Sequence, residues 1–242
     1  MLKIQNLTKK FEGGDIPALN NINFSLNKGE FCILLGTNGS GKSTLLKTIL
    51  DEYLHYTGKI LINNEATQKN IIYLDQNIYN GTIGEMTLLE NMALSFIINK
   101  KASFSYYENY RDKIISILAQ LNIGLENFID KKLLHLSGGQ RQIIATLIAI
   151  NSAPSLFLLD EHTSALDPKM QKVLMEFTNK KIRENNITSI MITHKLEDAI
   201  NYGDRLLIMN EGKIIFNLAS EEKSKLSIDE LEVIFYKLHK FQ

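Results

Sequence analysis

The feature that most constrains this chain is a glycine-rich loop between an apolar run and a helix-forming segment. The sequence GTNGSGKST at residues 36–44 follows the apolar run at 31–35 and precedes LLKTIL. It fits the pattern G-x-x-x-x-G-K-[S/T], whose glycines let the backbone curl so that successive N–H groups point at phosphate oxygens. The helix N-terminus that follows adds partial positive charge. A strand, loop and helix in this order predict an α/β fold with a nucleotide-phosphate site.

Two side chains of this loop have specific chemistry. Lys42 is expected to reach the β- and γ-phosphates, and Ser43 to coordinate Mg²⁺. A glycine-rich turn without a ligand is the alternative, and the strand–loop–helix context disfavours it. The residues predicted to line the site are Gly36, Thr37, Asn38, Gly39, Ser40, Gly41, Lys42, Ser43 and Thr44.

Further apolar runs at residues 71–74, 156–159 and 189–193 predict more strands of the same sheet. Near-continuous apolar runs are typical of parallel strands that are buried on both faces. Polar residues follow each run, and in open α/β sheets ligands bind at the carboxyl ends of the strands. We therefore expect the following residues to face the same crevice as the loop: Gln76, Asp160, Glu161 and His194.

Asp160 and Glu161 are adjacent carboxylates at the end of a buried-looking run, where desolvation makes them costly. A metal ion accounts for Asp160, because enzymes with a phosphate-binding glycine loop of this kind hold Mg²⁺ with an aspartate at the end of a neighbouring strand. Glu161 lies one residue further and can address the γ-phosphate and an attacking water. The alternative is that Glu161 caps the segment HTSALDP.

The stretch HLSGGQRQIIATLIAI contains a second predicted helix N-terminus. Ser137 and two glycines are expected to open an amphipathic helix, and its start is a second potential anion site. The glycine-rich loop already binds the phosphates of one nucleotide. A second phosphate-binding helix start is therefore most useful if it binds the nucleotide held by another chain. The residues expected on one face of the helix are Ile143, Ile144, Leu147 and Ile148.

Capping patterns predict that residues 87–150 are mostly helical. A Ser or Thr side chain and a Glu three residues later satisfy each other's backbone N–H group in such a box. Asp167 before Pro168 predicts a further helix start. The boxes are Thr87 with Glu90, Ser105 with Glu108, and Ser227 with Glu230 at the C-terminal helix.

Composition excludes several classes of protein. The 242 residues contain 27 Lys plus Arg and 27 Asp plus Glu, so no net charge points to nucleic acid. Cys32 is the single cysteine, which rules out an intramolecular disulfide and fits a reducing compartment. The longest apolar region, residues 143–159, is interrupted by Asn151, Ser152 and Pro154, which predicts a helix and a strand rather than a membrane span.

In this order, several motifs resemble the nucleotide-binding subunit of ATP-binding cassette (ABC) transporters over nearly the whole chain. They are GTNGSGKST, Gln76, LSGGQRQ, LFLLDE, SALD and His194. The resemblance implies a RecA-like α/β core with an antiparallel β edge at about residues 1–80 and 151–242. A helical subdomain at about residues 81–150 is inserted into this single ABC ATPase domain.

The resemblance also implies roles for individual residues. Phe11 stacks on adenine, and Gln76 contacts Mg²⁺ and couples to the membrane permease. His194 contacts the γ-phosphate, Glu161 polarises the attacking water, and Asp167 links two sites across a dimer interface. In a head-to-tail dimer, the signature segment of one chain grips the ATP of the other through Ser137, Gly138, Gly139 and Gln140.

Two positions depart from the family pattern. Phe11 stands where tyrosine is more usual, a mild change because stacking needs only the ring. His162 follows the glutamate where the family usually has proline. His162 can pack and hydrogen-bond in place of the proline, or it can tune Glu161 or sense phosphate. We favour the packing role, because His194 already matches the family's sensor position.

From this resemblance we expect a MgATP-hydrolysing subunit of a bacterial importer, peripheral on the cytoplasmic face of the membrane. The region around DEHTSALDP and the segment ENNITSIMITHKLEDAINYGDRLLIMNEGKIIF are similar to an importer branch paired with amino-acid-type binding proteins. The expected partners are a second copy of the chain, permease subunits and a substrate-binding protein. Alternatives are an exporter subunit, or a soluble cassette acting on nucleic acid or ribosomes.

Overall fold

The computed structural model describes residues 2–53, 55–63, 70–75, 81–97 and 107–240. Gln76 and Ser105, two residues that the sequence singles out, lie outside these ranges. The chain divides into two compact units, and each is described by itself. The first unit comprises residues 1–73, 155–161 and 185–242, and the second comprises residues 74–154 and 162–184.

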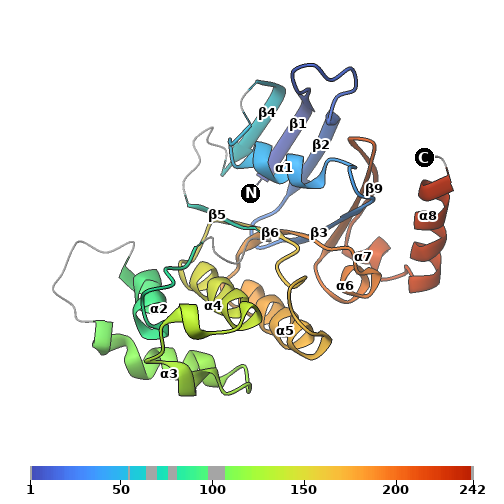
Figure 1. The fold of residues 1–242 in the computed structure, drawn as a ribbon. Coiled ribbons are helices and arrows are strands. Elements are labelled where there is room, and N and C mark those ends of the chain that lie inside the picture. The colour runs from blue at the N-terminus through green and yellow to red at the C-terminus, as the bar shows by residue number, and fades with distance from the viewer. Residues whose placement is uncertain (1, 54, 64–69, 76–80, 98–106, 241–242) are drawn as a thin grey trace. The chain divides into compact units, whose positions relative to one another are not determined.

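The first unit begins with a three-stranded antiparallel sheet in the order β2-β1-β4 (Figure 1). Buried and more exposed residues alternate along its first two strands, as expected for a sheet with one face against a core. The antiparallel β edge that the resemblance implies is seen in the antiparallel pairing of β1 with β2, where Leu2 lies opposite Leu26. The strands are β1 (Leu2–Lys9), β2 (Leu19–Leu26) and β4 (Tyr56–Ile62).

A second sheet of six strands has the order β5-β6-β7-β3-β8-β9. Every residue of β3, β6 and β7 is buried, which explains their continuous apolar sequences. β3 pairs in parallel with β7 and β8, and β6 pairs in parallel with β7. The strands are β3 (Phe31–Gly36), β5 (Ile71–Leu74), β6 (Leu156–Asp160), β7 (Thr188–Ile192), β8 (Arg205–Asn210) and β9 (Lys213–Leu218).

One hydrophobic core contains side chains from both sheets and from the helix that follows β3. Representative members are Leu2, Leu26, Leu34, Leu45, Leu158 and Ile192. Cys32 is buried in the same core as a free thiol, and burial raises the pKa of this thiol. Cys32 therefore packs as an apolar residue of the core. The helices of this unit are α1 (Lys42–Ile49), α6 (Leu196–Asn201), α7 (Ser220–Lys223) and α8 (Ile228–Lys240).

The second unit is helical. In Figure 1, α2 to α5 form a group in which α4 lies beside α2 and α5. Short 3₁₀ turns at Tyr107–Tyr110, Leu125–Phe128 and Leu133–His135 connect the longer helices. The helices are α2 (Leu88–Ile97), α3 (Arg111–Ala119), α4 (Gly138–Asn151) and α5 (Pro168–Glu184).

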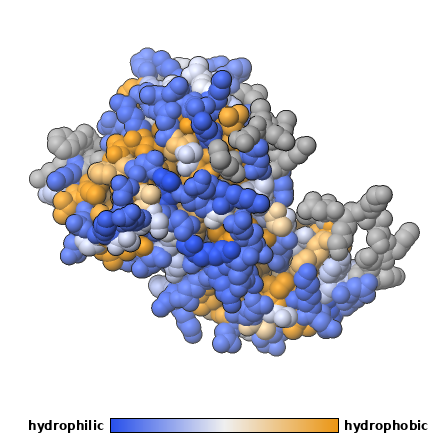
Figure 2. Space-filling view, turned by 180° about the vertical axis from the view of Figure 1, so that it is seen from behind, coloured by the Kyte–Doolittle hydropathy of each residue, from blue (hydrophilic) through white to orange (hydrophobic). Residues whose placement is uncertain are grey.

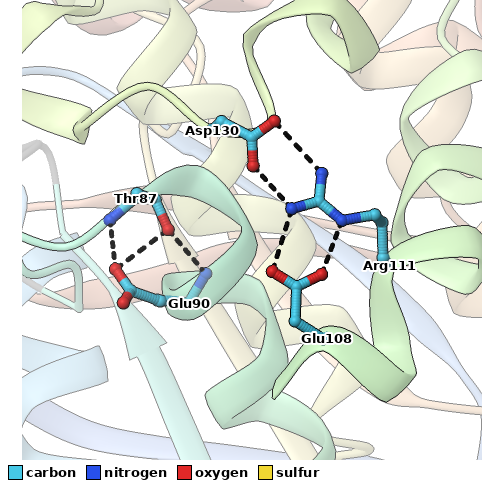
Figure 3. A network of polar contacts seen from close by, with 5 residues as sticks. All are labelled: Thr87, Glu90, Glu108, Arg111 and Asp130. Atoms are coloured by element: carbon cyan, nitrogen blue, oxygen red, sulfur yellow. Dashed lines mark hydrogen bonds and ion pairs between the residues drawn. The ribbon is translucent and has the colours of Figure 1, made fainter. Parts of the chain in front are cut away.

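Two polar clusters fix local geometry in this unit (Figure 3). Thr87 and Glu90 form the predicted capping box: Thr87 N donates to Glu90 Oε2 at 2.7 Å, and Glu90 N donates to Thr87 Oγ1 at 3.1 Å. Arg111 binds both Glu108 and Asp130, with distances down to 2.6 Å to the Asp130 carboxylate. The arginine holds the pKa of each carboxyl below its usual range, and it joins the start of α3 to residues before α4.

Helix α4 differs from the sequence prediction. Its residues from Gln142 to Leu147 are all buried, and Ile148 is only half-buried. The helix is therefore enclosed on most sides rather than buried along one stripe, because it packs against both α2 and α5. Hydrophobic periodicity alone does not reveal this second packing surface.

The surface is mixed in character. Hydrophilic side chains predominate on the face shown in Figure 2, and apolar ones appear between them. Within the described ranges, no helix has the length and apolar character that crossing a membrane requires.

Candidate active site

The glycine-rich loop connects β3 to α1 in the first unit, as predicted. A Cβ at Gly36 would lie 2.4 Å from the carbonyl oxygen of Met209, so no larger residue fits there. Gly41 has a φ of 100° and precedes the first turn of α1, a left-handed conformation that favours glycine. Its N-cap is Gly41, which has no side chain, and no side-chain cap is seen at this helix start among the described residues. The backbone N–H groups at the start of α1 therefore have no side-chain competitor for an anion.

Lys42 lies over the loop. Its Nζ donates to the carbonyl oxygens of Gly36 at 2.9 Å and Thr37 at 2.8 Å, and the side chain is buried. Burial lowers the pKa of Lys42, while the Glu161 and Asp160 carboxylates act to raise it. The charges of both acids therefore act on Lys42. This agrees with the prediction that the glycine-rich loop and the two acids face the same crevice.

Asp160 ends β6 and is buried. Its Oδ2 accepts a hydrogen bond from the Tyr73 hydroxyl of β5 at 3.1 Å. The carboxylate of Asp160 and the hydroxyl of Ser43 are oxygen ligands of the kind that Mg²⁺ prefers. No group of three or more His, Cys, Asp or Glu residues among the described residues could hold a metal. The donor set fits Mg²⁺ bound together with substrate phosphates, which is the usual way proteins bind this ion.

Glu161 and His194 are in direct contact, through Oε1 of the carboxylate and Nε2 of the imidazole. Glu161 has a φ of 50°, an uncommon conformation for a residue with a side chain, and its N–H donates to the Ile192 carbonyl at 3.3 Å. His194 follows β7, where Lys195 N donates to Thr193 Oγ1 at 3.1 Å. The ends of β6 and β7 thus bring these two predicted residues together.

Phe11 follows β1, and the residue is 42% exposed. A base can therefore reach it, as its predicted stacking role requires. The first unit contains five of the predicted site features: the loop, Phe11, Asp160, Glu161 and His194. Gln76 lies outside the described residues.

The signature segment lies in the second unit and caps its own helix. Gln140 N donates to Ser137 Oγ at 3.2 Å, and Ser137 N donates to Gln140 Oε1 at 2.9 Å. This reciprocal capping box fixes the start of α4. Ser137 itself is exposed, and its hydroxyl proton is not used in the box.

A pocket of about 380 Å³ opens beside this helix start. Asp167, which caps α5 by accepting from Lys169 N at 3.0 Å and Met170 N at 3.1 Å, is part of its lining. A Cβ at Gly139 would lie 2.8 Å from Cδ2 of Leu166, another residue of the lining. The pocket is lined by Ser137, Gly139, Gln140, Leu166, Asp167 and Met170, with further apolar side chains.

His162 is 1% exposed. Burial lowers its pKa to about 3, so the imidazole is neutral near pH 7. Within the described part of the chain, its Nε2 has no hydrogen-bond partner. This burial agrees with the packing role favoured from the sequence, whereas the hydrogen bond expected with that role is not seen at Nε2.

Two aromatic residues of the site were not predicted. Tyr73 hydrogen-bonds Asp160, and Tyr53 contacts the ring of Phe11. The only available signal for Tyr73 was its place in the apolar run before Gln76, which suggests a strand neighbour. Tyr53 carries no such signal, because it lies in a turn after α1.

Comparisons with known proteins agree with this geometry. Residues 19–164 match the sequence model of the ABC transporter family. The tyrosine transport ATP-binding protein of Clostridioides difficile (strain R20291) is 34% identical over 248 residues, covering 96% of this chain and 97% of that protein. A sulfate/thiosulfate import ATP-binding protein of Nitrosomonas europaea is 36% identical over 88% of this chain, which spans 59% of that longer protein.

A solved structure gives the same answer for the fold. The dimeric post-hydrolysis state of an ATP-binding cassette bound to ADP and Pi has a TM-score of 0.76 and 29% identity, covering 91% of this chain and 99% of that chain. The α/β fold and the resemblance expected from the sequence are both confirmed. The chain therefore belongs to the ABC transporter family, as an ATP-binding subunit that hydrolyses ATP.

Proposed function

We propose that this chain cleaves the bond between the β- and γ-phosphates of ATP with its glycine-rich loop, Asp160, Glu161 and His194. The observation that carries this assignment is the contact of Glu161 with His194 at the ends of two neighbouring strands, in the same unit as the loop that Lys42 covers. A lysine over a phosphate-binding loop, together with a glutamate and a histidine at neighbouring strand ends, is an arrangement suited to phosphoryl transfer. The residues assigned to the phosphates are Gly36, Thr37, Asn38, Gly39, Ser40, Gly41, Lys42, Ser43 and Thr44.

Glu161 is assigned to the attacking water. The water oxygen attacks the γ-phosphorus in line, the bond to the β–γ bridging oxygen breaks, and Glu161 orients the water and takes its proton. His194, in contact with Glu161, is assigned to the γ-phosphate. Catalysis of this kind is mainly positioning and electrostatic stabilisation, because little covalent chemistry is left to the protein.

Ser43 and Asp160 are assigned as ligands of Mg²⁺, and the resemblance adds Gln76. When bound, the ion neutralises charge that develops on the phosphate oxygens. The Tyr73 hydroxyl supports this role by holding the Asp160 carboxylate through Oδ2. Phe11 is assigned to the adenine, and its 42% exposure leaves room for the base.

The signature residues Ser137, Gly138, Gly139 and Gln140 are proposed to grip the ATP held by a second copy of the chain. They belong to the helical subdomain that we place at about residues 81–150. Asp167 is proposed to link the two sites, and its position in the same pocket as Ser137 supports that role. The dimeric state of the similar cassette supports the assembly of two copies.

The transport role follows from the relatives. Both curated relatives are named as ATP-binding proteins of transport or import systems. We propose that ATP binding closes the dimer and hydrolysis opens it, and that membrane permease subunits convert this motion into import. The chain would then be peripheral on the cytoplasmic face of the membrane, working with a substrate-binding protein. The relative named for tyrosine transport supports amino acids as the class of cargo.

A pull-down from gently solubilised native membranes tests the transport role, with the partners identified by mass spectrometry. The proposal predicts recovery of a polytopic membrane protein. Recovery of ribosomes or DNA-associated proteins without a membrane protein would contradict it and favour a soluble cassette. The direction of transport can be measured with vesicles that contain the recovered membrane partner and this chain. Accumulation of substrate on the side of the membrane opposite to this chain would indicate an exporter.

A further inference from the structure

The ring of Phe11 belongs to a cluster of two aromatic side chains and a lysine. The centroids of Phe11 and Tyr53 are 5.2 Å apart and their planes meet at 87°, an edge-to-face contact. Lys9 Nζ lies 5.1 Å from the Phe11 centroid and 5.9 Å from that of Tyr53. Both distances are within the range of cation–π attraction. The orientation of Phe11 is therefore set by Lys9, two residues before it in the chain, and by Tyr53 from a distant part of the sequence.

The cluster has a buried side and an open side. Lys9 is 6% exposed and its Nζ donates to the carbonyl oxygen of His55 at 3.4 Å. Tyr53 is half-buried, whereas Phe11 is 42% exposed. Lys9 and Tyr53 thus support a ring that stays accessible to a ligand.

Tyr53 also connects this ring to the glycine-rich loop at residues 36–44, called the phosphate loop from here on. It follows α1, the helix that ends at Ile49 and whose first residue is Lys42. Lys47 of the same helix has its Nζ 6.0 Å from the Tyr53 ring. One short segment therefore carries the phosphate-binding end at its start and a contact to the base-binding ring just beyond its end.

We propose that Tyr53 is a positioning residue for nucleotide binding: its edge-to-face contact holds the Phe11 ring where the base stacks, at a fixed separation from the phosphate loop. This inference rests on the assignment of Phe11 to the adenine. Tyr53 acts through Phe11 and not on the nucleotide itself. Its loss should therefore weaken binding of the base and leave binding of the phosphates unchanged.

The test compares ATP with inorganic triphosphate, which has no base, by calorimetric titration in the presence of Mg²⁺. Tyr53→Leu should raise the Kd for ATP about three- to tenfold, the effect of one aromatic pair, and leave the Kd for triphosphate unchanged. Tyr53→Phe keeps the ring and should restore the ATP affinity to within about twofold. Tyr110→Leu is the matched control, because it removes the stacked contact with Phe96 in the second unit.

A double-mutant cycle with Phe11→Ala separates this inference from the role of Phe11. The proposal predicts that Phe11→Ala weakens ATP binding and that adding Tyr53→Leu weakens it no further. Additive losses would mean that Tyr53 contacts the base directly, which overturns the positioning role. Equal weakening of ATP and triphosphate by Tyr53→Leu would also overturn it. If Tyr53→Leu binds ATP with wild-type affinity, only the positioning role of Tyr53 is refuted. If Phe11→Ala binds ATP with wild-type affinity, the assignment of Phe11 to the adenine is refuted, and the role of Tyr53 with it.

Discussion

The phosphate loop and the signature segment are both glycine-containing helix starts, but they are built differently. At α1 the N-cap is Gly41, so its own side chain cannot cap the helix, and the buried Lys42 supplies a positive charge over the loop. At α4 Ser137 and Gln140 cap each other, and Ser137 is exposed with its hydroxyl proton available. The site at the start of α1, here the first site, offers a full positive charge and backbone N–H groups and can therefore hold a polyphosphate. The site at the start of α4, the second site, offers mainly a hydroxyl and the helix end.

This difference implies an order of events. We expect the site with the buried lysine to bind nucleotide by itself, because charged hydrogen bonds contribute more than neutral ones. A self-capped helix start adds a weaker contact and is useful once a phosphate is already held elsewhere. Changes at the first site should therefore alter binding or chemistry directly, and changes at the second should alter only what depends on a partner chain.

The largest expected effect is on chemistry at the first site. Glu161→Gln should lower turnover at saturating ATP by at least about 10²-fold, or roughly 2.7 kcal/mol of barrier, because the amide cannot accept the proton of water. A phosphate-release assay measures this rate. The Kd for ATP should change little, and the variant should accumulate as an ATP-bound dimer. Normal hydrolysis by this variant would remove Glu161 from its assigned role.

Binding at the first site should depend on Lys42. Lys42→Ala should raise the Kd for ATP about 10- to 100-fold, the range expected for lost hydrogen bonds to a charged group. Calorimetric titration of the isolated chain measures this constant. Lys59→Ala is a suitable control, because Lys59 is exposed on β4. Equal losses in the two variants would mean that general surface charge, and not the loop lysine, holds the phosphates.

The second site should respond differently. Ser137→Ala should leave the Kd of the isolated chain for ATP within about twofold and lower turnover about tenfold, by the loss of one hydrogen bond to a charged oxygen. The variant also loses a helix cap, which costs about 1 kcal/mol of stability. Ser227→Ala is therefore the matched control, since Ser227 caps α8 through the same kind of box with Glu230.

A loss of stability alone should not slow hydrolysis. Ser227→Ala should lower the unfolding midpoint by a similar amount. If it also lowers turnover as much as Ser137→Ala does, the loss of turnover in Ser137→Ala results from the lost helix cap. A Ser137→Ala variant with a strongly raised Kd in the isolated chain would show that the signature segment acts within its own chain. Either result would break the contrast between the two helix starts.

The smallest effect on turnover is expected at His162. Burial lowers its pKa to about 3, below that of an exposed histidine near 6.5. Its stabilising contribution is therefore complete above about pH 6.5 and is lost as the pH falls towards 3, with a slope of up to about 1.4 kcal/mol per pH unit. His162→Leu should flatten this slope in urea unfolding while turnover stays within about threefold. A variant of unchanged stability that no longer hydrolyses ATP would instead give His162 a catalytic role.

Much of the first site could be predicted from sequence, because its parts are local. The glycine loop, the acids after β6 and the histidine after β7 each follow an apolar strand, and parallel pairing then brings the strand ends together. Capping boxes are equally local, so the helix starts at Thr87 and Ser227 agree with the structure.

Other features depend on packing between distant segments and could not be read from a motif. The burial of α4 on most sides requires both α2 and α5, and Tyr73 meets Asp160 only because β5 lies next to β6. The contact of Tyr53 with Phe11 joins a turn after α1 to the end of β1. No spacing rule connects such residues, since tertiary contacts alone determine their distance.

The composite two-chain site is tested most directly by mixing Lys42→Ala with Ser137→Arg and measuring ATP hydrolysis at an ATP concentration well below the raised Kd of Lys42→Ala, where neither variant alone should turn over appreciably. In a dimer of one chain of each kind, one composite site has an intact loop from one copy and an intact signature segment from the other. Random pairing should then restore up to about a quarter of wild-type turnover, since half of the dimers are mixed and each has one complete site. If both helix starts act within a single chain, mixing restores no turnover, and the composite two-chain site is wrong.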